Sequence, residues 1–123
     1  MSITTVEDLI EAGLVPASRR EALGEVGARY AIGLSEPLAA LIDPADPDDP
    51  IAKQFIPDPQ ELIVEPEERG DPIGDEAHSP IEGIVHRYPD RVLLKLLHVC
   101  PVYCRFCFRR ETVGPGSAVY LSA

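Results

Sequence analysis

The sequence predicts an α/β protein in which an N-terminal helical extension precedes the first strand of a partial, truncated (β/α) barrel. Residues 1–42 carry helix-start signals and apolar residues at helical spacing. Residues 91–99 form one nearly continuous apolar run, which is typical of a strand buried on both faces of a parallel sheet. The cysteines follow that run at once, where functional loops leave the strands of α/β barrels. We expect three segments: a helical extension at 1–42, an acidic, proline-rich connector at 43–83, and the start of the barrel at 84–123.

Three short helices are expected in the helical extension. The first should end at Gly13, and the third should stop before Pro44, because the residue before a proline disfavours helix. The apolar spacing of the second points Ala22, Val26 and Tyr30 to one face. The expected first-turn pairs are, in chain order, Thr4 with Glu7, Ser18 with Glu21, and Ser35 with Pro37.

The connector is set apart by its acid and its proline. It holds twelve Asp or Glu between Asp43 and Glu76, against Lys53 and Arg69 alone. Nine prolines between Pro37 and Pro80 exclude regular structure beyond a turn or two around residues 51–55. We expect an extended segment that wraps a larger body or stays mobile.

Charge and hydropathy argue against a protein that binds nucleic acid or a membrane surface, or that spans a membrane. A formal net charge of −10 argues against nucleic acid or a membrane surface as a partner. No stretch reaches the roughly 18 apolar residues of a membrane span, and the N-terminus lacks the form of a signal peptide. Three reduced cysteines and no leader predict a cytoplasmic location.

Cys100, Cys104 and Cys107, the only cysteines of the chain, lie within eight residues. They follow a turn expected at Pro89-Asp90 and the apolar run. Three thiols cannot all pair as disulfides, and loops this short would be strained. Together they could hold an iron–sulfur cluster. A zinc site completed by a histidine, or three unrelated buried thiols, are the alternatives.

The segment HVCPVYCRFC at residues 98–107 resembles the cluster-binding signature of radical S-adenosylmethionine enzymes, with the aromatic Phe106 just before the last cysteine. The flanking sequences DPIGDEAHSPIEGIVHRYPDRVLL and CRFCFRRETVG are similar to those of the lysine 2,3-aminomutase family. The resemblance covers residues 71–114 well and the helical extension more loosely. It implies a radical enzyme that uses a 4Fe-4S cluster, S-adenosylmethionine and pyridoxal 5′-phosphate to move an amino group to the neighbouring carbon of an amino acid.

The resemblance also implies roles for particular residues. Cys100, Cys104 and Cys107 would ligate three irons and leave the fourth open for S-adenosylmethionine. Arg109 would pair with the substrate carboxylate, a task that suits a forked guanidinium. The remaining implied contacts, to the phosphate of pyridoxal phosphate, would come from Arg87, Tyr88 and Arg91.

The same resemblance suggests partners and a state for this chain. Its substrate would be free lysine, glutamate or a lysine on a protein. An external donor such as flavodoxin or ferredoxin would supply the electron, and the full-length form would be a homo-oligomer. We expect the chain to be an N-terminal fragment that does not turn over substrate alone. The alternative is a stand-alone iron–sulfur or zinc-binding module without catalysis.

Overall fold

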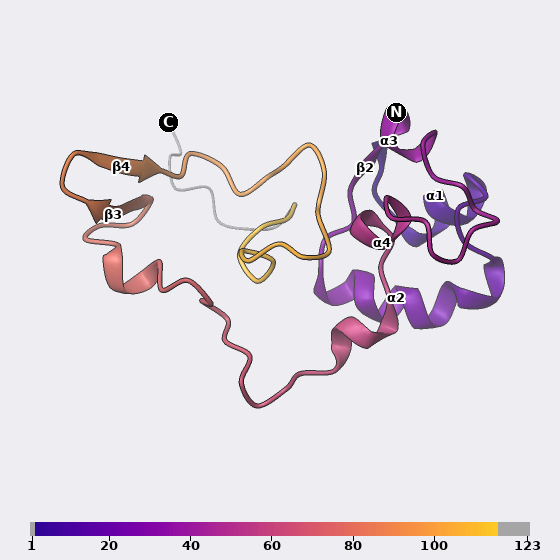
Figure 1. The fold of residues 1–123 in the computed structure, drawn as a ribbon, viewed down its shortest axis with the longest axis horizontal. Coiled ribbons are helices and arrows are strands. Elements are labelled where there is room, and N and C mark those ends of the chain that lie inside the picture. The colour runs from indigo at the N-terminus through magenta and orange to yellow at the C-terminus, as the bar shows by residue number, and fades with distance from the viewer. Residues whose placement is uncertain (1, 116–123) are drawn as a thin grey trace.

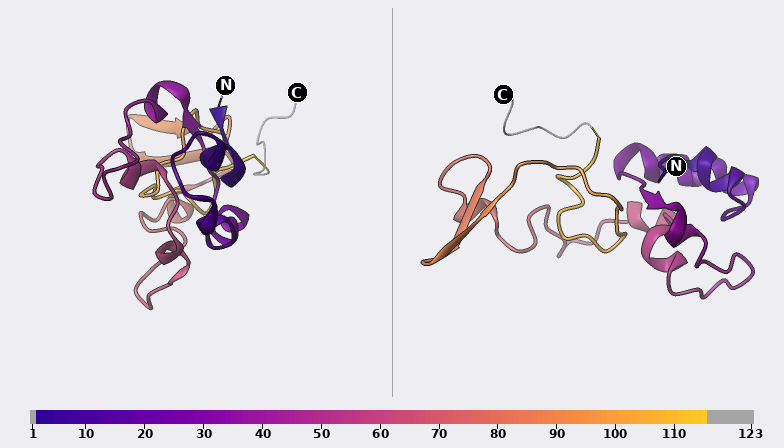
Figure 2. Two further views of the ribbon diagram at one scale, coloured as in Figure 1. Left: turned by 90° about the vertical axis from the view of Figure 1, so that its right-hand side faces the viewer. Right: turned by 90° about the horizontal axis from the view of Figure 1, so that it is seen from above.

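The computed structural model describes residues 2–115 of the chain. Helices gather at one end, the β3–β4 hairpin lies at the other, and the cysteine-bearing segment runs between them (Figure 1). The view from above shows the same elongated arrangement (Figure 2). In chain order the elements are β1 (Ser2–Ile3), α1 (Val6–Glu11), a 3₁₀ turn (Ala17–Arg19), α2 (Arg20–Arg29), β2 (Leu34–Ser35), α3 (Glu36–Ala39), α4 (Ala52–Phe55), 3₁₀ turns at Pro59–Leu62 and Glu76–His78, β3 (Ile84–Tyr88) and β4 (Arg91–Leu94).

Helix α1 begins with a capping box one residue later than the sequence predicts. Thr5 is the cap, and its hydroxyl accepts a hydrogen bond from the backbone N–H of Asp8 at 3.1 Å. The Asp8 carboxylate accepts in return from the N–H groups of Thr5 and Thr4. The expected pairing of Thr4 with Glu7 is therefore wrong by one position. The helix ends as expected, because Gly13 takes a positive φ of 71° that favours glycine.

The other two predicted helices are present with altered ends. Ser18 lies inside a 3₁₀ turn and does not cap α2, which starts at Arg20 without a side-chain cap. Val26 and Tyr30 are buried, as the apolar spacing predicts. Helix α3 starts after Ser35 as expected but ends at Ala39, and Leu41 is 61% exposed.

The main hydrophobic cluster lies among these N-terminal elements and the first part of the connector, and Val102 of the later chain packs against it. Leu9, Leu23 and Leu34 are fully buried at its centre. Strands β1 and β2 pair antiparallel, with Ile3 opposite Leu34, so both of these core residues lie in one short sheet. Phe55 of α4 joins the same cluster. Residues 2–62, called the helical body below, therefore pack around one core.

The connector is less extended than its proline content predicts. The expected helical turn near residues 51–55 is present as α4, and the buried Asp49 carboxylate accepts from the backbone of Ile51, Ala52 and Asp43. Beyond residue 62 the chain runs extended toward the hairpin (Figure 1). The segment boundaries at 42 and 83 remain a prediction, and residues 116–123 of the last segment lie outside the described residues.

The predicted buried strand of a parallel sheet is wrong for the part of the chain that the structure describes. Strand β4 pairs antiparallel with β3 across the turn at Pro89 and Asp90, which is confirmed. All four residues of β4 are exposed. A strand is buried on both faces only where other elements pack on those faces, whereas β3 pairs with the edge of β4 and covers neither face. The observed fold is a small α/β arrangement with two short sheets, and residues 2–115 form no closed barrel. No helix within these residues is long and apolar enough to cross a membrane.

Candidate functional site

The three cysteines lie on a loop of turns at residues 100–107, called the cysteine loop below. All three thiols are free; Cys100 and Cys104 are exposed, and Cys107 is half-buried. The backbone N–H of Cys107 donates to the carbonyl of Cys104 at 3.2 Å, which curls the end of the loop. Among residues 2–115, no three His, Cys, Asp or Glu side chains are gathered closely enough to hold a metal. Three soft sulfur donors on one accessible loop suit an iron–sulfur cluster chemically, although their thiols are not drawn together here.

Tyr103 attaches the cysteine loop to the helical body. Its side chain is 7% exposed, and its N–H donates to the carbonyl of Gly33 at 2.9 Å. The ring lies so close to Gly33 that a β-carbon there would be 2.5 Å from the ring. The Tyr103 hydroxyl accepts a long hydrogen bond from the N–H of Cys100 at 3.4 Å. Tyr103 therefore connects the start of the loop to the chain between α2 and β2.

Arg105 is the second anchor, two residues further along. Its guanidinium forks onto the Glu61 carboxylate at 2.7 and 3.0 Å, and it donates to the carbonyl of Ala31 at 2.8 Å. Its own N–H donates to the carbonyl of Gln54 at 2.7 Å. The arginine side chain is 6% exposed and the glutamate side chain 13% exposed. Two parallel hydrogen bonds fix the orientation of the Arg105 side chain relative to Glu61. Because both ions have lost their water, each depends on the other as its partner.

The residue between the two anchors and the residue after them are exposed. Cys104 is exposed, and Phe106 is 80% exposed. The loop therefore alternates, with Tyr103 and Arg105 inward and Cys104 and Phe106 outward. The sequence marks Phe106 as part of the motif, but nothing in it distinguished Arg105, whose burial depends on a glutamate 44 residues earlier.

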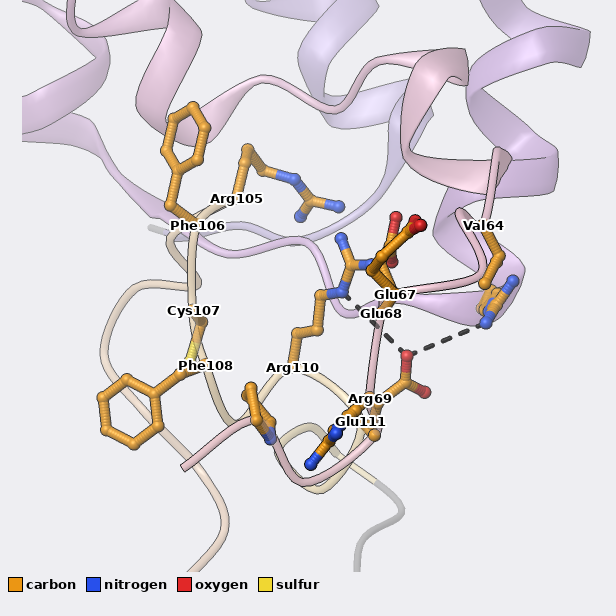
Figure 3. Close-up of a pocket in the computed structure, with 13 residues that line it drawn as sticks. Val64, Glu67, Glu68, Arg69, Arg105, Phe106, Cys107, Phe108, Arg110 and Glu111 are labelled. Atoms are coloured by element: carbon orange, nitrogen blue, oxygen red, sulfur yellow. Dashed lines mark hydrogen bonds and ion pairs between the residues drawn. The ribbon is translucent and has the colours of Figure 1, made fainter. Parts of the chain in front are cut away.

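A cleft of about 840 Å³ opens beside the cysteine loop. Figure 3 shows Cys107 between the rings of Phe106 and Phe108, with the side chains of Arg105 and Arg110 extending to the other side. Glu111 lies within 3.9 Å of Arg110 and 3.7 Å of Arg29. The cleft thus has an aromatic wall and a wall of paired charges, with one candidate ligand thiol in its lining.

Two of the predicted ligand-binding arginines meet at a carboxylate that the sequence did not single out. Asp75 is 8% exposed and accepts from Arg87 Nη2 at 3.1 Å through Oδ1. Through Oδ2 it accepts from Nε and Nη2 of Arg109, at 3.0 and 2.9 Å. Burial raises the pKa of Asp75, but the hydrogen bonds and charges of Arg109 and Arg87 outweigh it and leave the pKa below its ordinary value.

Tyr88 and Arg91, the other predicted phosphate contacts, lie apart from that pair at the turn of the hairpin. The Arg91 guanidinium stacks over the Tyr88 ring at 4.6 Å. Arg91 also lies 3.7 Å from Asp90, and its side chain is 67% exposed. The structure therefore brings Arg87 to Arg109 and leaves Tyr88 and Arg91 in solvent.

His98 is held near the base of the cysteine loop. It is 7% exposed, and its Nδ1 lies 2.7 Å from the carbonyl oxygen of Thr112. The carbonyl of His98 accepts from the N–H of Gly114 at 2.8 Å. These contacts close residues 98–114 into one lobe that carries all three cysteines and Arg109.

Several known proteins, all of them aminomutases, are similar to this chain over almost its whole length. No family model matches it. The L-lysine 2,3-aminomutase of Clostridium subterminale is 38% identical over 112 residues, which is 91% of this chain and 27% of that protein. The glutamate 2,3-aminomutase of Clostridioides difficile is also 38% identical over 112 residues, and the L-lysine 2,3-aminomutase of Bacillus subtilis is 30% identical over 113. This chain spans about a quarter of the length of these curated relatives, covering 24–27% of each. Matched over nine-tenths of its own length by aminomutases, and bearing the cysteine loop described above, the chain belongs to the lysine 2,3-aminomutase family.

Proposed function

We propose that this chain is the cluster-binding portion of a radical S-adenosylmethionine, pyridoxal phosphate-dependent amino-acid 2,3-aminomutase. Three free cysteines on one loop, anchored on both sides of Cys104, carry the proposal. Relatives named lysine and glutamate 2,3-aminomutase support it. In this proposal β4 and the cysteine loop begin a (β/α) barrel.

Cys100, Cys104 and Cys107 would hold a 4Fe-4S cluster as thiolates. When bound, the cluster and S-adenosylmethionine supply a radical that removes hydrogen from the substrate, and pyridoxal phosphate stabilises the resulting radical. The anchors at Tyr103 and Arg105 keep the loop backbone in place while the thiols face outward.

The arginines would recognise the anionic groups of the ligands. Arg109 would bind the carboxylate of an amino acid, and Arg87, with Tyr88 and Arg91, would bind the phosphate of pyridoxal phosphate. The proposed substrate is an amino acid such as lysine or glutamate, with an external flavodoxin- or ferredoxin-like electron donor. We further propose a cytoplasmic location, a homo-oligomeric full-length form and no turnover by this chain alone.

A stand-alone zinc module is the second candidate, since three cysteines and one histidine are common zinc ligands. The surroundings of His98 count against it. Its ring is buried and already in contact with the Thr112 carbonyl, whereas Cys100 and Cys104 are exposed. A zinc site would require the ring to leave this position or the thiols to move toward it.

Anaerobic reconstitution of the 123-residue chain with iron and sulfide tests the proposal. We expect about four irons and four sulfides per chain, and a change in the electron paramagnetic resonance spectrum of the reduced cluster on adding S-adenosylmethionine. Replacing Cys100, Cys104 or Cys107 by Ala should remove most of the iron, because three thiolates are the minimum set. His78→Ala, outside the loop, is the matched control and should retain it. Full iron content in all three cysteine variants, or zinc in place of iron in the wild type, would refute the assignment.

A further inference from the structure

The backbone of Asp75 is held by hydrogen bonds on both sides of the residue. Its N–H donates to Asp71 Oδ1 at 2.9 Å, and its carbonyl accepts from the hydroxyl of Ser79 at 2.8 Å. The Asp71 carboxylate also accepts from the N–H of Glu76 at 2.8 Å. These local bonds hold the backbone of residues 71–79 in a turn, and the turn presents the carboxylate of Asp75 to the arginines.

The contacts of Arg109 divide its guanidinium into two parts. Nε and Nη2, the edge nearest the chain, both donate to one oxygen of Asp75. Within residues 2–115, these contacts leave Nη1 to a ligand, and the side chain is 30% exposed. The guanidinium also lies 4.4 Å from the ring of Phe108, which restrains its plane. An arginine held by one edge and open at the other is already oriented for a carboxylate.

Arg87 is held by the same carboxylate from the opposite side. Its Nη2 donates to Asp75 Oδ1 at 3.1 Å and to the carbonyl of Ile73 at 2.7 Å. Each oxygen of Asp75 therefore accepts from a different arginine, one on β3 and one two residues after the cysteine loop. The two cations stay together only because a negative charge lies between them.

We infer that Asp75 is a positioning residue that holds Arg109 in the orientation needed to bind a substrate carboxylate and ties it to Arg87. The inference rests on the proposed role of Arg109. Asp75 acts through the two arginines and touches neither ligand. It orders a long side chain before binding, so less conformational entropy is lost when the ligand arrives.

The opposing account is that Asp75 competes with ligand anions for Arg109. The two accounts predict opposite signs. If Asp75 competes, removing its charge strengthens binding of a carboxylate. If it positions, removing its charge weakens binding even though the site becomes more positive.

The experiment uses the full 123-residue chain with acetate as the carboxylate probe. Acetate is titrated while the Nε–Hε resonance of Arg109 is followed by NMR, with calorimetry as a second measure of the dissociation constant. Asp75→Asn removes the charge and keeps the shape, and Asp75→Glu keeps the charge. Glu68→Gln, which removes a charge 3.2 Å from Arg110, is the control for net charge.

Asp75→Asn should weaken acetate binding about three- to tenfold, the effect of ordering one long side chain on binding. It should also speed exchange of the Arg109 Nε proton with water. Asp75→Glu should recover part of the acetate affinity and part of the protection of the Arg109 Nε proton. Glu68→Gln should change neither the affinity nor the exchange rate. Unchanged or tighter binding by Asp75→Asn would overturn the inference.

Two further results keep the inference separate from the proposed function and from misfolding. If Arg109→Gln binds acetate as well as the wild type by calorimetry, the proposed role of Arg109 fails, whatever Asp75 does. If Asp75→Asn does not fold, the wild type alone decides: a slowly exchanging, ordered Arg109 Nε proton supports positioning, and a freely exchanging one overturns it.

Discussion

Two arginine–glutamate pairs in this chain have the same geometry in opposite surroundings. Arg105 forks onto Glu61 at 2.7 and 3.0 Å, and Arg20 forks onto Glu7 at 2.7 and 3.0 Å. The first pair is buried, whereas both side chains of the second are 56% exposed. The first pair has further hydrogen bonds, from Arg105 to the Ala31 carbonyl and from the N–H of Asp58 to Glu61, but burial is the main difference between the two pairs.

Glu61→Gln should lower the free energy of unfolding by about 3 kcal/mol, because it leaves the buried charge of Arg105 uncompensated. Glu7→Gln, the matched control, should have a much smaller effect, since water and salt already screen that pair. Chemical denaturation of both variants measures the difference. Equal losses would show that the cysteine loop does not depend on this anchor.

The Asp75 cluster makes stability depend on pH in the acid range. The pKa of Asp75 in the folded chain lies below its ordinary value of 3.8. The folded state therefore binds the proton less readily than the unfolded state, and the stabilisation is present above that value and lost as the pH falls below it.

The free energy of unfolding should accordingly fall more steeply between about pH 5 and pH 2 in the wild type than in Asp75→Asn. Carboxylates with lowered pKa values outside this cluster, such as Asp8, contribute equally to both proteins and cancel in the difference. Urea unfolding at a series of pH values gives the two curves. Parallel curves would mean that the ion pairs with Arg87 and Arg109 do not form in solution.

At the scale of elements, the cysteine loop and the helical body are joined by a close backbone contact. A β-carbon at Gly33 would lie 2.5 Å from Cδ2 and 3.1 Å from Cε2 of Tyr103, both atoms of a buried ring. The ring cannot move aside without leaving the interface. Gly24, inside α2, has nothing within 4 Å of the same position.

Gly33→Ala should therefore destabilise the protein by about 1–3 kcal/mol through overpacking. Gly24→Ala should stabilise it by about 0.5–1 kcal/mol, because alanine restricts the unfolded chain and favours helix. Thermal unfolding of the two variants distinguishes them. A Gly33→Ala protein as stable as the wild type would mean that Tyr103 is not packed there.

Local signals in the sequence predicted the helices well and their partners poorly. The capping residues, Gly13 and the proline at position 37 act within a turn or two, so the positions of α1 and α3 could be predicted to within a few residues. The cysteines were likewise singled out by a local pattern, their spacing together with Phe106 and the flanking sequences, and their role stays a prediction. Glu61 and Asp75 lie 44 and 34 residues from the arginines that they bind, and no local pattern encodes such a pairing.

The predicted buried strand failed for a different reason. The apolar run of residues 91–99 indicates side chains that favour burial, but it does not show which other elements would pack against them. In the described chain only β3 lies beside β4, so the same residues that predict burial are exposed. The roles of the cysteines and arginines remain predictions that the experiments above test.

At the scale of the whole molecule, the two ends differ in how much apolar surface they expose. The helical body encloses its core, whereas six apolar residues of β4 and the chain after it are exposed, with Lys95 and the buried His98 between them. The exposed fractions of the six are Val92 52%, Leu93 43%, Leu94 52%, Leu96 48%, Leu97 68% and Val99 57%. Contiguous apolar surface beside unpaired strand edges promotes association.

The 123-residue chain should therefore associate as its concentration rises, and Leu97→Lys should reduce the effect. Leu41→Lys is the control, because Leu41 is 61% exposed but lies on the helical body. Sedimentation velocity over a range of concentrations gives the mass of the species. Association that Leu41→Lys relieves as much as Leu97→Lys would place the contact elsewhere.

The alternation of inward and outward side chains in the cysteine loop limits how its length can vary. Deleting Cys104, the one residue between Tyr103 and Arg105, would turn the guanidinium toward solvent and bring the ring of Phe106 to face Glu61. Inserting one residue there would likewise move the guanidinium to an outward position. Chain-length changes here should therefore be tolerated only in pairs, whereas the extended residues 63–70, which precede the turn that carries Asp75, can accept single insertions.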